Sequence, residues 1–131
     1  MPHLVLEYSD NLPAAVDFDA LFTRLHAALV ETAGVRLADI KSRAVPQARF
    51  RAGAGAPEAV FAHLGVALFA GRDAAQQQRI SARLLELLRE AFAVAWAERP
   101  CDLTVELREI RREGYAKAMN ERAGGARPAG A

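Results

Sequence analysis

The residues with the clearest capacity for chemistry stand at the start of the chain, where Pro2 follows Met1 and leads directly into an apolar stretch. Inside a chain the proline nitrogen is a tertiary amide without a proton, but at a free terminus it is a secondary amine that can take and return one. We expect removal of Met1, which a small second residue permits, to create a general base. A terminal amine has a pKa of about 8 in small peptides, and an apolar pocket or neighbouring cations lower it. Such a base suits proton transfer at neutral pH.

Three basic residues are candidates for binding an anionic substrate. Lys41 and Arg43 stand two apart in a strand-like stretch and therefore share a face, and Arg72 precedes Asp73 at the turn into a predicted helix, where backbone N–H groups favour an anion. Simpler roles stay open for each of them. Lys41 and Arg43 could be edge-strand charges that prevent aggregation, and Arg72 could be a solvated residue beside a helix cap. The Met-Pro start is also common in proteins that make no use of it.

Composition limits the class of protein. The chain has 131 residues, 52% of them hydrophobic, with 17 basic and 16 acidic side chains, which indicates one globular domain without a basic face for nucleic acid or anionic membranes. The lone Cys101 forms no internal disulfide, and with three scattered histidines it assembles no metal site. We expect His3 and His63 to be packed and hydrogen-bonded rather than catalytic. We also expect a cytoplasmic protein without signal peptide, membrane span or cofactor.

The elements that must position these residues begin with a strand, a helix and a second strand. Residues 3–8 alternate between apolar and polar side chains, with the period of a strand. Asp17 is a suitable N-cap for a helix, and Gly34 is a suitable C-terminal stop. Residues 39–45 have strand character, which Pro46 is expected to end.

The same order is repeated in the second half of the chain. Residues 48–57 are rich in glycine, alanine and arginine and indicate a loop, whereas residues 58–69 are almost continuously apolar, as in a strand covered on both faces. A second helix is expected to start at Asp73, to carry a buried stripe as far as Ala95 and to be ended by Pro100, and a last strand is expected from residue 102 to residue 110. The sequence therefore contains the pattern strand, helix, strand twice.

The predicted fold is α/β (α+β): a duplicated β-α-β arrangement that forms a four-stranded sheet with two helices on one face. We predict a single domain at residues 1–111, with units at about 1–47 and 57–111. The uncovered face of the sheet is too apolar along residues 58–69 to stay in water, so we expect it to pack against copies of itself.

Residues 112–131 form a C-terminal extension. Its first part contains helix-compatible residues around 115–119, and its last eight residues are expected to be disordered because they are small, glycine-rich and terminal.

The chain resembles the tautomerase superfamily and, within it, the 5-carboxymethyl-2-hydroxymuconate delta-isomerase family. The resemblance spans about residues 1–111, and its most specific parts are the opening eleven residues and the Gly71-Arg72 pair before a glutamine-rich helix start. The four stretches that carry it are Met1-Pro2-His3-Leu4-Val5-Leu6-Glu7-Tyr8-Ser9-Asp10-Asn11, Ile40-Lys41-Ser42-Arg43, Gly71-Arg72 and Val105-Glu106-Leu107-Arg108-Glu109-Ile110.

The resemblance implies roles for residues and an assembly. In this family the mature N-terminal proline carries the proton, subunits form trimers with their sheets facing inward, and pockets lie near subunit boundaries. It therefore implies that Pro2 is the base, that Arg72 binds or polarises a carboxylate, and that Arg43 and Lys41 assist. Where the family usually has Ile-Arg-Ser-Arg, this chain has Lys41 in place of the first arginine. An ammonium group cannot form the bidentate hydrogen bonds to a carboxylate that a guanidinium forms.

The implied activity is that of a cofactor-independent isomerase, which moves a proton in an unsaturated hydroxy- or oxo-polycarboxylate. The expected substrate is 5-carboxymethyl-2-hydroxymuconate, from the breakdown of aromatic compounds. One alternative is another activity on the same scaffold: an enol-keto tautomerase of phenylpyruvate-like acids, a decarboxylase or a hydratase. The other is a non-catalytic trimeric interaction protein.

Overall fold

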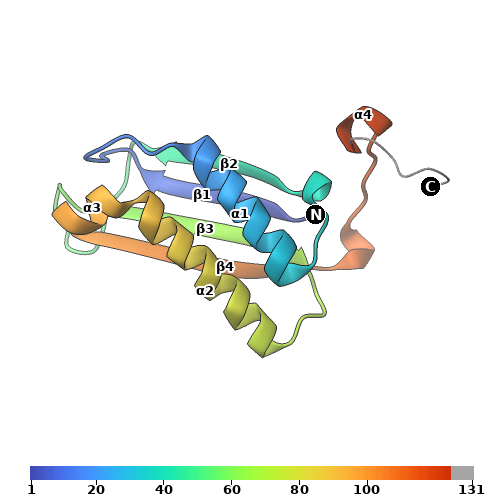
Figure 1. Cartoon of the computed structure of the whole chain (residues 1–131). Coiled ribbons are helices and arrows are strands. Elements are labelled where there is room, and N and C mark those ends of the chain that lie inside the picture. The colour runs from blue at the N-terminus through green and yellow to red at the C-terminus, as the bar shows by residue number, and fades with distance from the viewer. Residues whose placement is uncertain (125–131) are drawn as a thin grey trace.

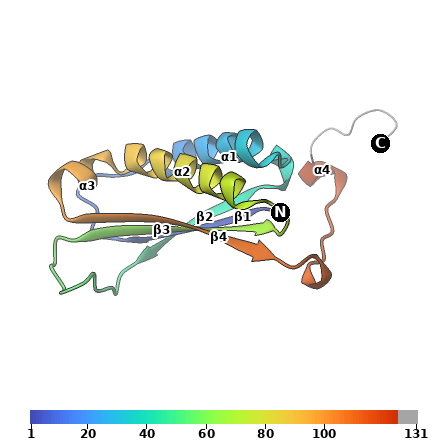
Figure 2. The ribbon, with the colours of Figure 1, turned by 90° about the horizontal axis from the view of Figure 1, so that it is seen from below.

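A strand–helix–strand pattern occurs twice in the computed structural model, which describes residues 1–124. Figure 1 shows the four strands as one sheet, and Figure 2 shows the long helices α1 and α2 together on one side of it. This arrangement confirms the predicted fold class; the division of the chain at residue 111 stays a prediction. The main elements are β1 (His3–Ser9), α1 (Phe18–Ala33), β2 (Lys41–Gln47), β3 (Val60–Phe69), α2 (Ala74–Ala91) and β4 (Cys101–Ile110). The short helices are η1 (Leu37–Asp39), α3 (Ala93–Glu98), η2 (Arg112–Gly114) and α4 (Glu121–Gly124).

The order of strands in the sheet is β2-β1-β3-β4, so the first strand of the chain is an inner strand. β1 runs parallel to β2 and antiparallel to β3, and β4 runs parallel to β3. His3 therefore pairs with Lys41 on one side and with Ala67 on the other. β3 and β4 end on the side of the sheet where β1 starts. The N-terminus, the start of β2 and the C-terminal extension therefore all lie at this one end of the strands.

The core lies between the sheet and the two long helices because alternate strand residues point toward the helices. β3 shows this most clearly, with a strict alternation of buried and half-buried residues along its whole length. Leucine supplies most of the core, and each buried leucine stabilises the fold by about 1.5–3 kcal/mol. The fully buried leucines are Leu4, Leu6, Leu25, Leu29, Leu64, Leu84, Leu87 and Leu88.

The ends of the helices confirm the signals in the sequence. The side chain of Asp17 accepts a hydrogen bond from the backbone N–H of Ala20 at 3.0 Å, and that of Asp73 accepts one from Gln76 at 2.8 Å. Gly34 ends α1 in the left-handed conformation, with φ of 70°. The second helix does not run unbroken to residue 95 as predicted: it divides at the buried Phe92 into α2 and α3.

The prediction that Pro46 ends the second strand is wrong. Pro46 lies inside β2, opposite Tyr8 of β1. β2 is an edge strand, where a residue without a backbone N–H costs no ladder hydrogen bond on its outer side. The strand also begins later than predicted, because residues Leu37–Asp39 form a short 3-10 helix before it.

The composition of residues 115–119 is compatible with a helix, but they do not form one. That stretch has no regular secondary structure and lies between the short helices η2 and α4. Its side chains instead contact the edge of the sheet, and such tertiary contacts override a weak helical propensity. Of the last eight residues, for which disorder was expected, Gly124 belongs to α4, and the other seven lie outside the described residues.

Within residues 1–124, no helix covers the second face of the sheet (Figure 2). The half-buried side chains of Phe61 and Phe69 point to it from β3, together with His63. His63 contacts Thr104 through Nδ1 at 2.6 Å and Glu106 through Nε2 at 3.2 Å. The second face is therefore mixed: Phe61 and Phe69 of β3 and Val5 of β1 are apolar, whereas β4 contributes the polar Thr104 and Glu106. No helix among residues 1–124 is long and apolar enough to cross a membrane.

The packing predicts a large cost for Leu64→Ala. Leu64 is completely buried in β3, so the variant loses the transfer free energy of the side chain and leaves a cavity. We expect a loss of about 3 kcal/mol in the free energy of unfolding, measured by urea denaturation at a fixed protein concentration. The matched control is Val94→Ala, because Val94 is 43% exposed. A similar stability for both variants would contradict this account of the core.

Candidate active site

The start of the chain is held at the edge of the core. Met1 is 8% exposed and Pro2 is buried. The terminal amine of Met1 donates a hydrogen bond to the backbone oxygen of Asp39 at 3.1 Å, and the backbone N–H of Lys41 donates to the carbonyl oxygen of Pro2 at 3.2 Å. The first two residues are thus fixed against the residues that lead into β2.

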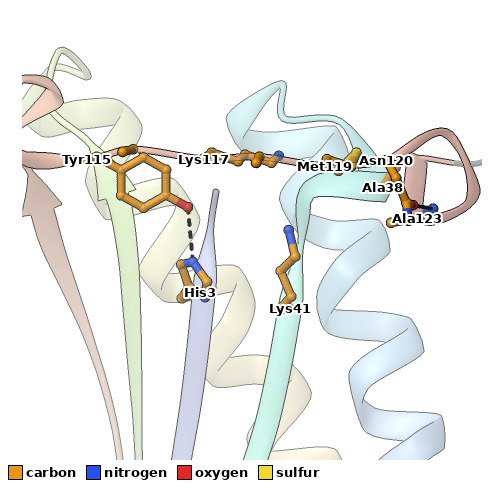
Figure 3. A pocket seen from close by; sticks show the side chains of 10 residues that line it. His3, Ala38, Lys41, Tyr115, Lys117, Met119, Asn120 and Ala123 are labelled. Atoms are coloured by element: carbon orange, nitrogen blue, oxygen red, sulfur yellow. Dashed lines mark hydrogen bonds between the residues drawn. The ribbon is translucent and has the colours of Figure 1, made fainter.

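A pocket of about 590 Å³ opens beside this start, between the strands and the C-terminal extension. Figure 3 shows the extension passing over the starts of β1 and β2, with His3 and Lys41 below it. Neither Met1 nor Pro2 lines the pocket in this form of the chain, but the next residue, His3, does. The lining residues are His3, Ala38, Lys41, Ala123 and residues 115–120.

Two ammonium groups lie at this pocket, and both contact Asp39. Lys41 donates from Nζ to the backbone oxygen of Asp39 at 3.0 Å, and Lys117 of the extension donates from Nζ to its carboxylate at 2.6 Å. The side chains of Lys117 and Asp39 are 32% and 20% exposed, so this ion pair is partly shielded from water. With two positive charges and one carboxylate, the site keeps a net positive charge that suits an anionic ligand.

An aromatic side chain of the extension completes the wall of the pocket. The hydroxyl of Tyr115 lies 3.1 Å from Nε2 of His3 (Figure 3). The Tyr115 ring meets the ring of Phe69 edge-on, with centroids 5.3 Å apart and an angle of 89° between the planes. Tyr115 therefore joins the ends of β1 and β3.

The surroundings disfavour positive charge on groups that can lose it. Burial lowers the pKa of the Met1 amine, and Lys117 and Lys41 lower it further, against a smaller opposing effect of Asp39. Burial also lowers the pKa of His3, assisted by the terminal amine, Arg43 and the two lysines. An amine at this edge of the sheet is thus more easily neutral than one in water.

Of the four residues predicted from the sequence, the structure brings Pro2 and Lys41 together and places Arg43 next to them on the second face of the sheet. Arg43 pairs with Val5 in the sheet and lines a smaller hollow of about 240 Å³, which His3 also lines. His3 thus stands between Arg43 and the larger pocket.

Arg72 lies at the same edge of the sheet but points elsewhere. Its guanidinium donates to the carbonyl of Phe69 at 3.1 Å and to that of Ala33, at the end of α1, at 2.8 Å. It does not line the pocket described above. Its Nε is buried and has no hydrogen-bond partner within residues 1–124. In this single chain Arg72 connects α1 to β3.

The sequence reasoning missed three residues of the pocket: His3, Tyr115 and Lys117. His3 is hydrogen-bonded as expected, but its place beside a pocket is not predicted, and the sequence analysis gives the extension no role. The strand order β2-β1-β3-β4, which brings the end of β4 to the same end of the sheet as the start of β1, is no part of the sequence-based prediction, so the sequence carried no signal that the extension lines this pocket. Among the described residues, no group of three or more histidine, cysteine or acidic side chains is placed to hold a metal ion.

Comparisons with known proteins agree with one another. A family model described as 5-carboxymethyl-2-hydroxymuconate isomerase matches residues 2–123. The 5-carboxymethyl-2-hydroxymuconate Delta-isomerase of Escherichia coli is 29% identical over 110 residues, which cover 84% of this chain and 87% of that protein. The crystal structure of a 5-carboxymethyl-2-hydroxymuconate isomerase from Deinococcus radiodurans R1 superposes with a TM-score of 0.82 at 29% identity, covering 91% of this chain and 90% of the other. A fused 4-OT symmetric trimer gives a TM-score of 0.64 at 25% identity, covering 95% and 99%.

The contact between Lys117 and Asp39 predicts a measurable pKa change. The hydrogen bond from Lys117 lowers the pKa of Asp39, so Lys117→Met is expected to raise it. A lowered pKa favours the ionised carboxylate in the folded state, so its contribution to stability is present at neutral pH and is lost as the pH falls through the folded-state pKa. Carboxyl ¹³C NMR titration measures the change.

The control for this titration is Lys41→Met, because Lys41 contacts only the backbone oxygen of Asp39. It should leave the pKa of Asp39 nearly unchanged. Equal shifts in the two variants would show that the extension does not hold this carboxylate.

Proposed function

The chain belongs to the 5-carboxymethyl-2-hydroxymuconate isomerase family of the tautomerase superfamily, and we propose that its mature form uses the nitrogen of Pro2 as the general base of the isomerisation. The observation that carries the proposal is the burial of the chain start beside a pocket bounded by two ammonium groups. Removal of Met1 would expose the proline nitrogen at this place, and the same burial and charges that lower the pKa of the Met1 amine would act on it.

The reaction is a proton shift that needs no cofactor. The substrate named by the family is a muconate with a 2-hydroxyl group and three carboxylates. The neutral Pro2 nitrogen takes the proton of the 2-hydroxyl, or of an activated carbon, and negative charge develops on the oxygens of the conjugated system. The electrons shift along the double bonds as the carbonyl forms, and the protonated proline returns the proton to another carbon.

The cationic residues are proposed to bind the carboxylates of the substrate. Lys41 lines the pocket and Arg43 lies two residues farther along β2, so a long polycarboxylate at the edge of the sheet could contact both. Arg72 is proposed as a third such group. Its position at this edge supports the role, and so does its buried Nε, which has no partner in the part of the chain that the structure describes. Preorganised donors of this kind stabilise developing negative charge.

We also propose that the protein is a homotrimer that acts in the cytoplasm. The trimeric state is supported by the similar fused 4-OT protein, which forms a symmetric trimer. It is also supported by the second face of the sheet, where no helix of the described part of the chain covers the half-buried Phe61 and Phe69. In such an assembly a neighbouring subunit would cover this face near Arg43. The free thiol of Cys101 suits a reducing compartment.

The proline mechanism predicts that the base is lost when Pro2 is no longer terminal. Insertion of one alanine between Met1 and Pro2 turns the proline nitrogen into an amide, and we expect kcat/KM to fall by about 10²-fold or more. Pro2→Ala should also lower it, because a primary amine replaces the secondary amine. The wild-type kcat/KM should fall on the acid side with a pKa below about 8, because the base must be neutral.

The control is Pro46→Ala, which changes an exposed proline in the edge strand β2 and should leave kcat/KM unchanged. Intact-mass measurement of the purified protein establishes whether Met1 has been removed. A chain that keeps Met1 and is active, or a Pro2→Ala variant with full activity, would contradict the mechanism.

A second prediction concerns the substrate. Ultraviolet assays on a panel of enols with one, two and three carboxylates should show the highest kcat/KM for the tricarboxylate, because Lys41, Arg43 and Arg72 offer three cationic groups. Arg43→Ala should lower kcat/KM most strongly for that substrate. A profile confined to monocarboxylates would favour a phenylpyruvate-type tautomerase, and no turnover of any member would favour a non-catalytic protein.

A further inference from the structure

The hydroxyl of Tyr115 is placed where it can act on a bound substrate. Tyr115 and His3 both line the pocket and are hydrogen-bonded across it at 3.1 Å (Figure 3). His3 directly follows Pro2 in the chain, so the hydroxyl contacts the residue next to the proposed base. Tyr115 belongs to the C-terminal extension, to which the proposed mechanism gives no role so far.

The position of the Tyr115 ring is fixed from two sides. It meets Phe69 edge-on at 5.3 Å and the ring of His3 at 6.2 Å between centroids. The guanidinium of Arg112, at the start of the extension, lies over the Phe69 ring, 4.3 Å from its centroid. These contacts hold the hydroxyl oxygen in place before any ligand binds.

The surroundings of His3 decide where the hydroxyl hydrogen points. The pKa of His3 is lowered, mainly by burial, so at neutral pH the ring carries one proton, on either Nδ1 or Nε2. Nδ1 is buried and has no hydrogen-bond partner in the described chain. A buried N–H without an acceptor is rarer than an acceptor without a donor, so the proton belongs on Nε2.

This tautomer makes His3 the donor and the oxygen of Tyr115 the acceptor of their hydrogen bond. The hydrogen of the Tyr115 hydroxyl is then not used by His3 and is free to point into the pocket. The opposite tautomer would consume that hydrogen and leave an N–H of His3 buried without a partner.

We propose that Tyr115 is a catalytic residue that donates its hydroxyl hydrogen bond to the substrate oxygen on which negative charge develops when Pro2 takes the proton. His3 is a positioning residue, which orients that hydroxyl. No proton changes place between Tyr115 and the substrate; the hydrogen bond strengthens as the oxygen becomes anionic. The inference rests on the proposed function, and it extends the active site into the C-terminal extension.

The test is Tyr115→Phe, which keeps the ring and its contact with Phe69 but removes the hydroxyl. We expect kcat with the tricarboxylate enol to fall by about 10²-fold while KM changes little, because the donor acts mainly in the transition state. The matched control is Tyr8→Phe, since Tyr8 packs against Phe18 at the far end of β1 and should keep wild-type kcat. A Tyr115→Phe variant with wild-type kcat would overturn the proposal.

A second measurement does not depend on turnover. In protein labelled with ¹⁵N-histidine, the ring nitrogens of His3, assigned with a His3→Gln variant, should show a protonated Nε2 and an unprotonated Nδ1 at neutral pH. The opposite tautomer, or a doubly protonated ring, would overturn the proposal. If the wild-type protein is inactive on every enol, the proposed function fails and the role of Tyr115 fails with it. If the wild-type protein is active and Tyr115→Phe is equally active, the role of Tyr115 alone fails.

Discussion

The site depends on one constraint, the inner position of the first strand. β1 lies between β2 and β3, so the chain begins inside the sheet rather than at a free edge, and Met1 and Pro2 are buried with it. An amine at this position loses part of its hydration, and burial is the largest cause of the lowered pKa of the Met1 amine. The fold thereby supplies what a terminal base requires: a fixed position and a weakened preference for the charged form.

The topology also decides what gathers around that amine. β2 starts beside β1, and the extension leaves β4 at the same edge of the sheet, so Lys41 and Lys117 arrive from distant parts of the chain. Both contact Asp39, which orients them without cancelling their combined charge. The site is therefore positive enough to attract a carboxylate and disfavours a charged amine. The lysines contribute to both properties, and burial is the largest cause of the lowered amine pKa.

Most of the fold could be predicted from local patterns. Alternating apolar residues indicated the strands, and Asp17 and Gly34 marked the ends of α1 because capping depends on neighbouring residues only. Pro46 was predicted wrongly, and the contacts of the extension were not predicted, because both depend on long-range facts: which strand is at the edge, and which surface the extension contacts. The pocket residues Tyr115 and Lys117 were not predicted for the same reason. The roles given to Arg43 and Arg72 came from resemblance and stay proposals.

The central claim is that the mature chain presents a proline amine whose pKa is lowered by burial and by the lysines around it. Titration of the Pro2 nitrogen by NMR, in ¹⁵N-proline-labelled protein that lacks Met1, tests this claim most directly. The account predicts a pKa below the value of about 8 for an ordinary terminal amine, and a rise toward it in Lys117→Met. A pKa of about 8 or above in the wild-type protein, unchanged in the variant, would contradict it.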